Sequence, residues 1–136
     1  MELAFHIEGG DFTSAGIASS QVKKVLKQIN VDPAVIKRVV VALYEAEVNI
    51  VAHAYRGDIK VRITPQQVFI CLEDEGPGIE NIEQAMQKGY STASAKVREM
   101  GFGAGMGLPN IKENSDEFII RSEVNKGTVL EITINI

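Results

Sequence analysis

Three polar residues spaced four apart, Glu45, Asn49 and His53, fall on one face of a predicted helix. The residues around them are small or apolar, and no lysine or arginine occurs between Arg38 and Arg56. Because a solvated helix face usually carries such charges, we expect this row to face a partly desolvated site. A carboxylate there is a candidate general base, and an amide oxygen is a candidate ligand for a hard metal ion. The alternative is an ordinary solvated helix face.

The segment 73–79, Glu-Asp-Glu-Gly-Pro-Gly-Ile, forms a second candidate site at the end of a predicted strand. The Asp74 carboxylate can accept a hydrogen bond from an exocyclic amine. Gly76 and Gly78 let the backbone approach a ligand closely. The alternative is a Gly-Pro turn capped by the aspartate.

Segment 101–109 has glycine at four alternate positions and leads into a predicted helix start. A row of backbone N–H groups at the positive end of a helix dipole can cradle an anion. The segment lacks the Lys-Ser/Thr of a Walker A loop, and no strand leads into it as in a dinucleotide fingerprint. A flexible hinge is the alternative.

Hydrophobic periodicity predicts the elements that must position these residues. A period of two predicts strands, and a helical period predicts three helices, the first capped by Ser14 and the second begun by Asp32 and Pro33. The predicted strands are 3–7, 59–63, 68–74, 118–120 and 130–136, and the predicted helices are 14–29, 33–54 and one starting at 108–112. This order predicts an α+β two-layer sandwich, a mixed, mostly antiparallel sheet with helices on one face.

Length and composition restrict the class of protein. With 136 residues, 45% hydrophobic and 24% charged, the chain is expected to form a single domain spanning 1–136. A net charge of −4 without a basic block makes nucleic acid a poor partner. The one cysteine cannot form an internal disulfide, and the sequence shows neither an export signal nor a membrane span. We therefore expect a cytoplasmic protein with no membrane partner.

Taken in order, the three sites resemble the N, G1 and G2 boxes of the GHKL ATPase superfamily, which implies its Bergerat ATP-binding fold. The motifs are Glu45-x-x-x-Asn49, Asp74-x-Gly76-x-Gly78 and Gly103-x-Gly105-x-Gly107. More narrowly, the chain is similar to bacterial anti-sigma factors and switch-protein serine kinases. The stretches that carry this narrower resemblance are His53-Ala54-Tyr55, Asp-Glu-Gly-Pro-Gly-Ile, Gly-Tyr-Ser-Thr, Gly-Met-Gly-Leu-Pro and Val124–Thr128.

The resemblance implies ATP and Mg²⁺ as cofactors and gives roles to particular residues. Asn49 would ligate Mg²⁺, Asp74 would bind the adenine amine, and Glu45 would be the base that orients or deprotonates the attacking hydroxyl. Further nucleotide-binding residues implied by the resemblance are Gly76, Gly78, Ile79, Gly103, Gly105, Met106, Gly107, Leu108 and Thr128.

The residues from about 80 to 107 would form the ATP lid. The chain has few large apolar groups over 75–107, which predicts a mobile segment with a weak helical pattern at 82–86. The chain departs from the family at one position of the lid. The sporulation anti-sigma factors have a lid arginine there, and this chain has Gly103-Ala104 at the matching place. Lys96 or Arg98 could supply the missing charge.

The function implied is an ATP-dependent protein serine/threonine kinase that phosphorylates an antagonist-type (STAS) partner in a partner-switching pathway regulating a sigma factor. A sigma factor or a phosphatase would be further partners. The alternatives are an anti-sigma factor or ATP-binding sequestering module without kinase activity, and a bare ATPase. Histidine-kinase activity is disfavoured, because the chain contains only His6 and His53 and no dimerisation helix with a phosphorylatable histidine.

Overall fold

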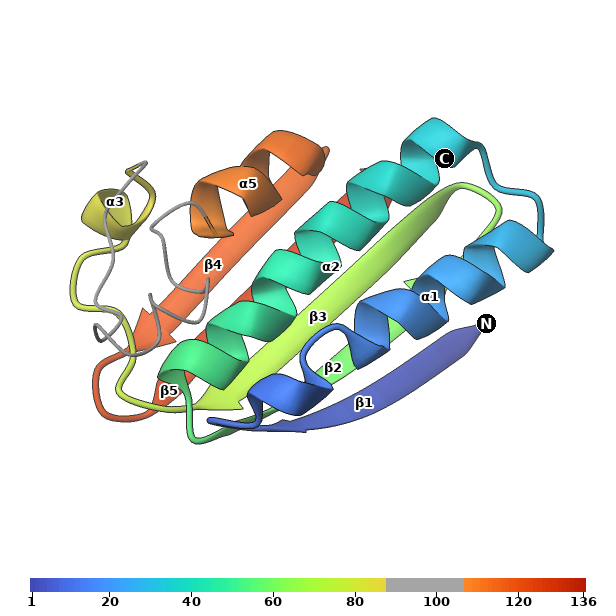
Figure 1. Ribbon diagram of the computed structural model, residues 1–136. Coiled ribbons are helices and arrows are strands. Elements are labelled where there is room, and N and C mark those ends of the chain that lie inside the picture. Colours follow the sequence, from blue (N-terminus) through green and yellow to red (C-terminus); the bar gives the residue numbers. More distant parts are fainter. Residues whose placement is uncertain (88–106) are drawn as a thin grey trace.

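The computed structural model describes residues 1–87 and 107–136. Five strands form one antiparallel sheet in the order β1-β2-β3-β5-β4, and helices α1, α2 and α5 cover one of its faces (Figure 1). The strands are β1 (Glu2–Glu8), β2 (Arg56–Ile63), β3 (Gln67–Glu75), β4 (Glu117–Glu123) and β5 (Gly127–Asn135). The helices are η1 (Phe12–Ser14), α1 (Ile17–Gln28), α2 (Pro33–His53), α3 (Ile82–Ala85) and α5 (Gly107–Asn114). The predicted two-layer α+β sandwich is confirmed.

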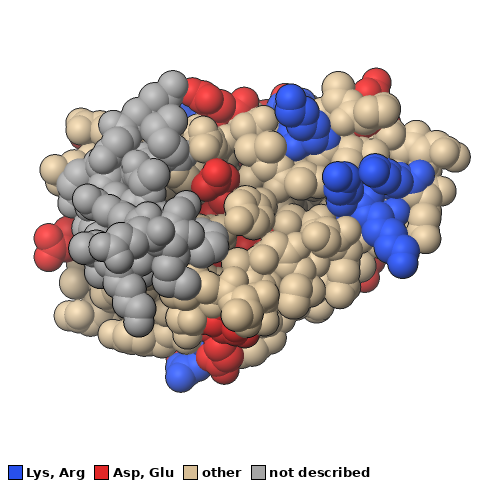
Figure 2. All heavy atoms as spheres, in the orientation of Figure 1, with Lys and Arg blue, Asp and Glu red and all other residues tan. Residues whose placement is uncertain are grey.

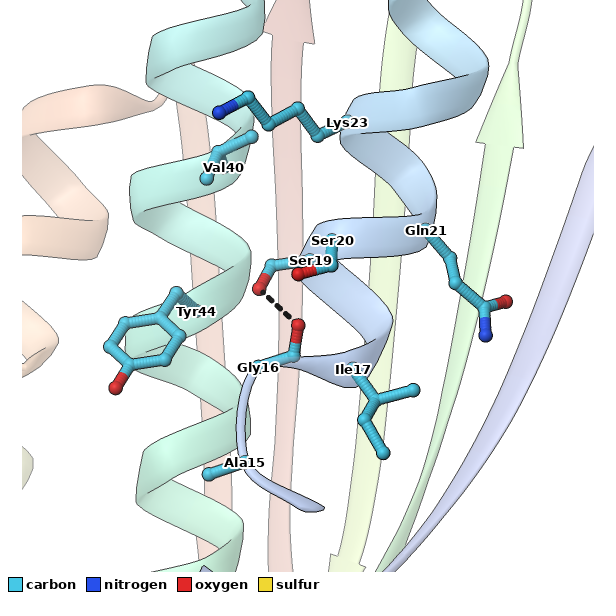
Figure 3. A pocket seen from close by; sticks show the side chains of 9 residues that line it. All are labelled: Ala15, Gly16, Ile17, Ser19, Ser20, Gln21, Lys23, Val40 and Tyr44. Atoms are coloured by element: carbon cyan, nitrogen blue, oxygen red, sulfur yellow. Dashed lines mark hydrogen bonds between the residues drawn. The ribbon is translucent and has the colours of Figure 1, made fainter. Parts of the chain in front are cut away.

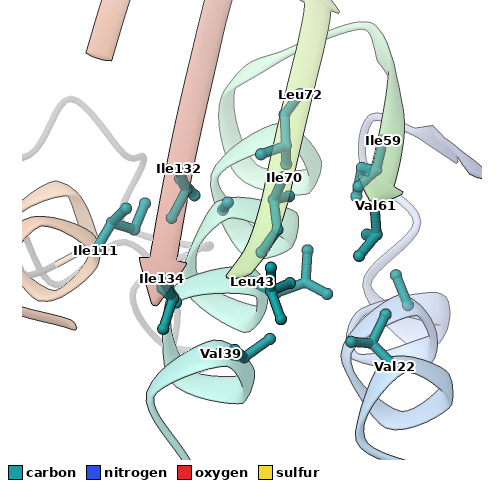
Figure 4. Packing of buried hydrophobic residues seen from close by; sticks show 14 of the residues in the cluster. Val22, Val39, Leu43, Ile59, Val61, Ile70, Leu72, Ile111, Ile132 and Ile134 are labelled. Atoms are coloured by element: carbon teal, nitrogen blue, oxygen red, sulfur yellow. The ribbon is translucent and has the colours of Figure 1, made fainter. Parts of the chain in front are cut away.

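Helix α2 is the central element of the helical layer. It begins as predicted, since the Asp32 side chain accepts a hydrogen bond from the Ala34 N–H at 2.8 Å and Pro33 occupies the first turn. Its buried stripe packs on the middle of the sheet together with side chains from α1 and α5 (Figure 4). The fully buried members of this core include Val22, Leu26, Val39, Leu43, Ile59, Ile70, Ile111, Ile132 and Ile134. A helix with this much apolar contact is held firmly against the strands.

The start of α1 differs from the prediction. Ser14 does not cap the helix: it ends the short helix η1, and α1 begins after Gly16, whose φ is +98°. No side chain from the segment preceding α1 caps its first turn. The capping group comes instead from Glu47 of α2, which is 1% exposed.

The Glu47 carboxylate accepts three backbone hydrogen bonds from the start of α1. Gly16 N–H donates to Oε2 at 2.9 Å, Ala18 N–H donates to Oε2 at 3.2 Å, and Ser19 N–H donates to Oε1 at 2.7 Å. The positive end of the helix dipole further stabilises the buried negative charge. Glu47 therefore fixes the position of α1 along α2.

The other predicted elements are present with small shifts at their ends. Hairpin 59–74 corresponds to β2 and β3, the helix starting at 108–112 is α5, and the weak pattern at 82–86 is the single turn α3. Three predicted nucleotide-binding residues, Gly103, Gly105 and Met106, lie outside the described residues, as does most of the predicted lid. Among the helices that the structure describes, none is both long enough and apolar enough to cross a membrane.

We predict that Glu47→Gln lowers the free energy of unfolding by about 1–3 kcal/mol, because glutamine has one acceptor oxygen for three backbone donors, two of them buried. Chemical denaturation monitored by circular dichroism measures the change. Glu73→Gln is the matched control, since Glu73 is an exposed carboxylate of β3 with no side-chain hydrogen bond or ion pair among the described residues. A loss no greater than that of the control would show that Glu47 does not hold α1 in place.

Candidate functional site

Glu45 lies half-buried between α2 and the first turn of α5. The Asn110 side chain donates a hydrogen bond from Nδ2 to Glu45 Oε1 at 3.3 Å. A Cβ added at Gly107 would lie 3.6 Å from Glu45 Oε2, so the start of α5 sits next to the carboxylate. No motif or spacing in the sequence singles out Asn110. Only the packing of α5 against α2 brings it to Glu45.

Asn49 and His53 continue along α2 from Glu45 and are also half-buried. The Asn49 side chain forms no hydrogen bond to any residue that the structure describes, which leaves its amide oxygen available to a ligand. Burial lowers the pKa of His53 below its ordinary value, because a partly desolvated site favours the neutral imidazole. The predicted row of polar groups is therefore in a partly desolvated setting, as the sequence indicated.

Asp74 lies where β3 and β5 separate. The last pair between these strands is Glu73 with Val129, so Asp74 and Thr128 are the next positions along each strand. The Thr128 N–H donates to Asp74 Oδ1 at 3.1 Å. Burial raises the pKa of Asp74 above its ordinary value, and the Thr128 hydrogen bond opposes this shift. The result is a half-buried carboxylate with acceptor capacity left over.

The two glycines after Asp74 have a packing reason in the folded chain itself. A Cβ at Gly76 would lie 3.0 Å from the Cα of Ala54, the residue that ends α2. Gly78 has φ +75°, and a Cβ there would lie 2.4 Å from the carbonyl oxygen of Glu123. Close approach to the protein's own backbone therefore requires glycine at position 78 and leaves little room for a side chain at position 76.

A hydroxyl pair connects the segment after β3 to the β4–β5 turn. Ser122 Oγ accepts from the Ile79 N–H at 2.8 Å and lies 3.0 Å from the Gly127 carbonyl oxygen, to which it donates. Since its single proton is used there, the 2.9 Å contact with Thr128 Oγ1 has the threonine as donor. No sequence pattern points to Ser122, because its role depends on the pairing of β4 with β5.

Gly127 completes this end of the site. Its φ is +154°, and a Cβ there would lie 1.9 Å from the carbonyl oxygen of Asp74. No other residue could bring β5 so close to the end of β3. The sequence marks Gly127 only as part of the Asn-Lys-Gly turn that joins the last two strands, and it gives no sign of this contact.

The predicted residues thus form two groups joined by α2. Asp74, Gly76, Gly78, Ile79 and Thr128 meet at the ends of β3 and β5, and Glu45 meets the start of α5 at Gly107. The distance along α2 from Glu45 to Ala54, which contacts Gly76, is about 13 Å. Asn49 lies between the two ends.

Leu108 stands apart from the other predicted ligand residues. Its side chain belongs to the hydrophobic core and is 7% exposed. Only its backbone is therefore available to a ligand at the start of α5.

Comparison with known proteins relates this arrangement to a family. The family model described as "Histidine kinase-like ATPase domain" matches residues 11–134. The serine/threonine-protein kinase RsbT of Bacillus subtilis is 32% identical over 125 residues, which cover 89% of this chain and 86% of that protein. The anti-sigma F factor of Geobacillus sp. (strain WCH70) is 37% identical over 92 residues, covering 63% of this chain. The match spans 60% of the length of that anti-sigma factor.

Two solved structures share the fold at low sequence identity. The RsbU and RsbW domains of Rv1364c from Mycobacterium tuberculosis match with a TM-score of 0.67 and 18% identity, covering 98% of this chain and 32% of that one. The SiaB–SiaC complex from Pseudomonas aeruginosa matches with a TM-score of 0.67 and 15% identity, covering 97% and 88%. Because the family model spans nearly the whole sequence, the chain belongs to the histidine kinase-like ATPase domain family.

Proposed function

We propose that the chain is an ATP-dependent protein serine/threonine kinase that phosphorylates a STAS-domain partner in a partner-switching pathway. The observation that carries the proposal is the placement of Glu45, held by Asn110 against the start of α5, one turn from Asn49 on the same face of α2. The similarity to RsbT, which is named as a serine/threonine-protein kinase, supports the same activity.

Asp74 is the proposed site of adenine recognition. Its carboxylate has one oxygen engaged by Thr128 N–H, and a carboxylate retains further lone pairs to accept from an amine. Partial burial excludes water that would compete for this hydrogen bond. Ile79 packs against the core beside this site and supplies apolar surface for a purine.

Asn49 is the proposed protein ligand of Mg²⁺. Mg²⁺ is held by one or two side-chain oxygens together with waters and substrate phosphates, and an amide oxygen without a hydrogen bond among the described residues meets that need. The described residues contain no cluster of three or more histidine, cysteine or acidic side chains that could hold a metal. A site completed by phosphate oxygens is consistent with this composition.

Glu45 is the proposed base. Bound ATP would supply the γ-phosphoryl group, and Mg²⁺ would neutralise the negative charge on its oxygens. Glu45 accepts the proton of the partner's serine or threonine hydroxyl as that oxygen bonds to phosphorus and the bond to the leaving ADP oxygen breaks. Asn110 fixes one carboxylate oxygen and leaves Oε2 for the hydroxyl. The amino terminus of α5, which begins at Gly107, would present backbone N–H groups to the phosphates.

A sequestering module without kinase activity is the second candidate. The match to an anti-sigma F factor favours it. The two candidates share the nucleotide site and differ only in whether Glu45 is used, so one phosphotransfer measurement separates them.

The test of the kinase follows the labelled γ-phosphate of Mg-ATP to a STAS-domain protein encoded beside the gene of this chain. We expect label on a serine or threonine of that protein, and Glu45→Ala to slow transfer by at least about 100-fold while ATP still binds. ATP binding without transfer by the wild-type protein would favour the sequestering module. Transfer at an undiminished rate by Glu45→Ala would contradict the role of Glu45.

Asn110→Ala should reduce the rate of transfer less than Glu45→Ala does, by about 10-fold, because it loosens the base without removing it. In the Glu45→Ala background, Asn110→Ala should have no further effect, since the two residues act as a unit. The four rates of this double-mutant cycle are measured at saturating ATP. Additive effects would show that Asn110 does not act through Glu45.

Asp74→Asn should weaken ATP binding about 10-fold or more, because an acceptor charge is lost. Isothermal titration calorimetry measures the affinity, and thermal unfolding without nucleotide serves as the control for folding. Since burial raises the pKa of Asp74, folding favours its protonated form. Without nucleotide, the Asp74→Asn protein should therefore be at least as stable as the wild-type protein.

The same shift predicts a pH dependence. ATP affinity of the wild-type protein should fall on acidification at a higher pH than an ordinary aspartate would cause, because the carboxylate protonates there. The phosphates of ATP also titrate, but they do so equally with Asp74→Asn, so the difference between the two proteins reports Asp74. Identical pH profiles would contradict the assignment.

A further inference from the structure

Positive charge is concentrated on one part of the helical layer, away from the candidate site. Residues 17–40 carry five basic side chains and a single acidic one, Asp32, in a chain whose net charge is −4. Arg38 pairs with Asp116 at 3.2 Å. The four lysines form no ion pair with any residue that the structure describes. These lysines are Lys23, Lys24 and Lys27 on α1 and Lys37 on α2.

A groove runs between the exposed faces of α1 and α2, and three of these lysines, Lys23, Lys27 and Lys37, line it. It consists of two hollows of about 690 and 590 Å³ that share Lys23 and Val40. In the first hollow, Lys23 extends from α1 above Val40 of α2 (Figure 3). The second hollow has Val31, Ile36 and Val40 among its lining residues. Figure 2 shows basic side chains gathered at one end of the helical face, beside an uncharged strip.

The charges stand on both sides of the second hollow. Lys23 and Lys27 line it from α1, and Lys37 lines it from α2. Asp32 carries the only negative charge on this part of the helical layer, and its carboxylate is engaged as the cap of α2. An occupant of the second hollow therefore meets apolar side chains together with ammonium groups contributed by both helices, whereas the first hollow adds only Lys23.

We propose that this groove, named here the α1–α2 groove, binds an amphipathic helix of a protein partner whose apolar stripe is flanked by glutamate or aspartate. A helix in a groove inserts side chains at i, i+3, i+4 and i+7, and its acidic residues then meet the lysines on both edges. Charge complementarity of this kind speeds association and selects the partner, while the apolar contacts provide most of the affinity. The proposal goes beyond the proposed kinase activity and does not require nucleotide.

Two other polyanions fit the groove less well. A lipid surface is bound by a protruding apolar face, whereas here the apolar residues line a hollow. Nucleic acid is favoured by arginine and aromatic side chains, and the second hollow has neither. The observations therefore favour a protein helix, and both other ligands serve as arms of the test.

The test uses a synthetic helix of ~14 residues with leucine at i, i+3, i+4 and i+7 and glutamate beside that stripe. A scrambled peptide of the same composition lacks the stripe. Methyl NMR spectra of the wild-type protein report binding at Val31, Ile36 and Val40. We expect the amphipathic peptide to shift these signals at concentrations at which the scrambled peptide does not.

Variants then test the contribution of each part of the groove. Lys23→Glu/Lys27→Glu should weaken binding of the amphipathic peptide by at least 10-fold, about 1.4 kcal/mol. Val40→Gln should weaken it as well by removing apolar contact. Lys60→Glu is the matched control, because Lys60 is an exposed lysine of β2 outside the groove, and it should leave binding unchanged. Circular dichroism confirms that each variant is folded.

Several results would overturn the proposal. Equal binding of the two peptides would show a non-specific polyanion site. Tighter binding to phosphatidylglycerol vesicles or to duplex DNA, lost in Lys23→Glu/Lys27→Glu, would assign the groove to that ligand instead. Peptide binding should persist in Asp74→Asn, so failure of the nucleotide site and failure of the groove are distinguishable.

Discussion

The packing of α2 across β3 and β5 is the constraint on which the rest of the structure depends. One side of this helix supplies core residues such as Val39 and Leu43, and the next turns supply the carboxylates of Glu45 and Glu47. Glu47 faces α1 and holds its first turn, whereas Glu45 faces α5. These two acidic residues, two positions apart, therefore have different roles: Glu47 stabilises the fold, and Glu45 is the proposed catalytic base.

The ends of β3 and β5 form the second fixed point. Thr128 is almost fully buried, donates its N–H to Asp74, and contacts Ser122 through its hydroxyl. Gly127 permits this approach because any side chain would strike the Asp74 carbonyl. The candidate adenine site is therefore preorganised by the strand ends, so little conformational entropy is lost when a ligand binds.

The parts of the fold that were predicted from the sequence are those governed by local periodicity. The alternation of apolar and polar residues over 59–63 and the apolar stripe of α2 both indicate which side chains are buried. Asp32 followed by Pro33 indicates a helix start, because the aspartate can cap the first turn and the proline fits its first position. The start of α1 differs from the predicted one, because its cap comes from Glu47, which lies 28 residues beyond Ser19. No local pattern can indicate a capping group supplied by another helix.

The same distinction applies to the candidate site. Glu45, Asn49 and Asp74 could be selected because their residue types and spacing resemble a family motif. Asn110 and Ser122 could not, since each acts through a partner brought near by packing or strand pairing. The packing roles of Gly76 and Gly78 could not be predicted from the sequence either, because the backbone that lies against them comes from distant residues.

The most direct test of the account compares the affinity of the wild-type protein for ATP and for inosine triphosphate, which has a carbonyl oxygen where adenine has its amine. If the Asp74 carboxylate accepts from that amine, calorimetry should show ATP binding tighter by about 10-fold or more, because inosine would place an acceptor against an acceptor. Equal affinities would contradict the assignment of the β3–β5 end as the adenine site.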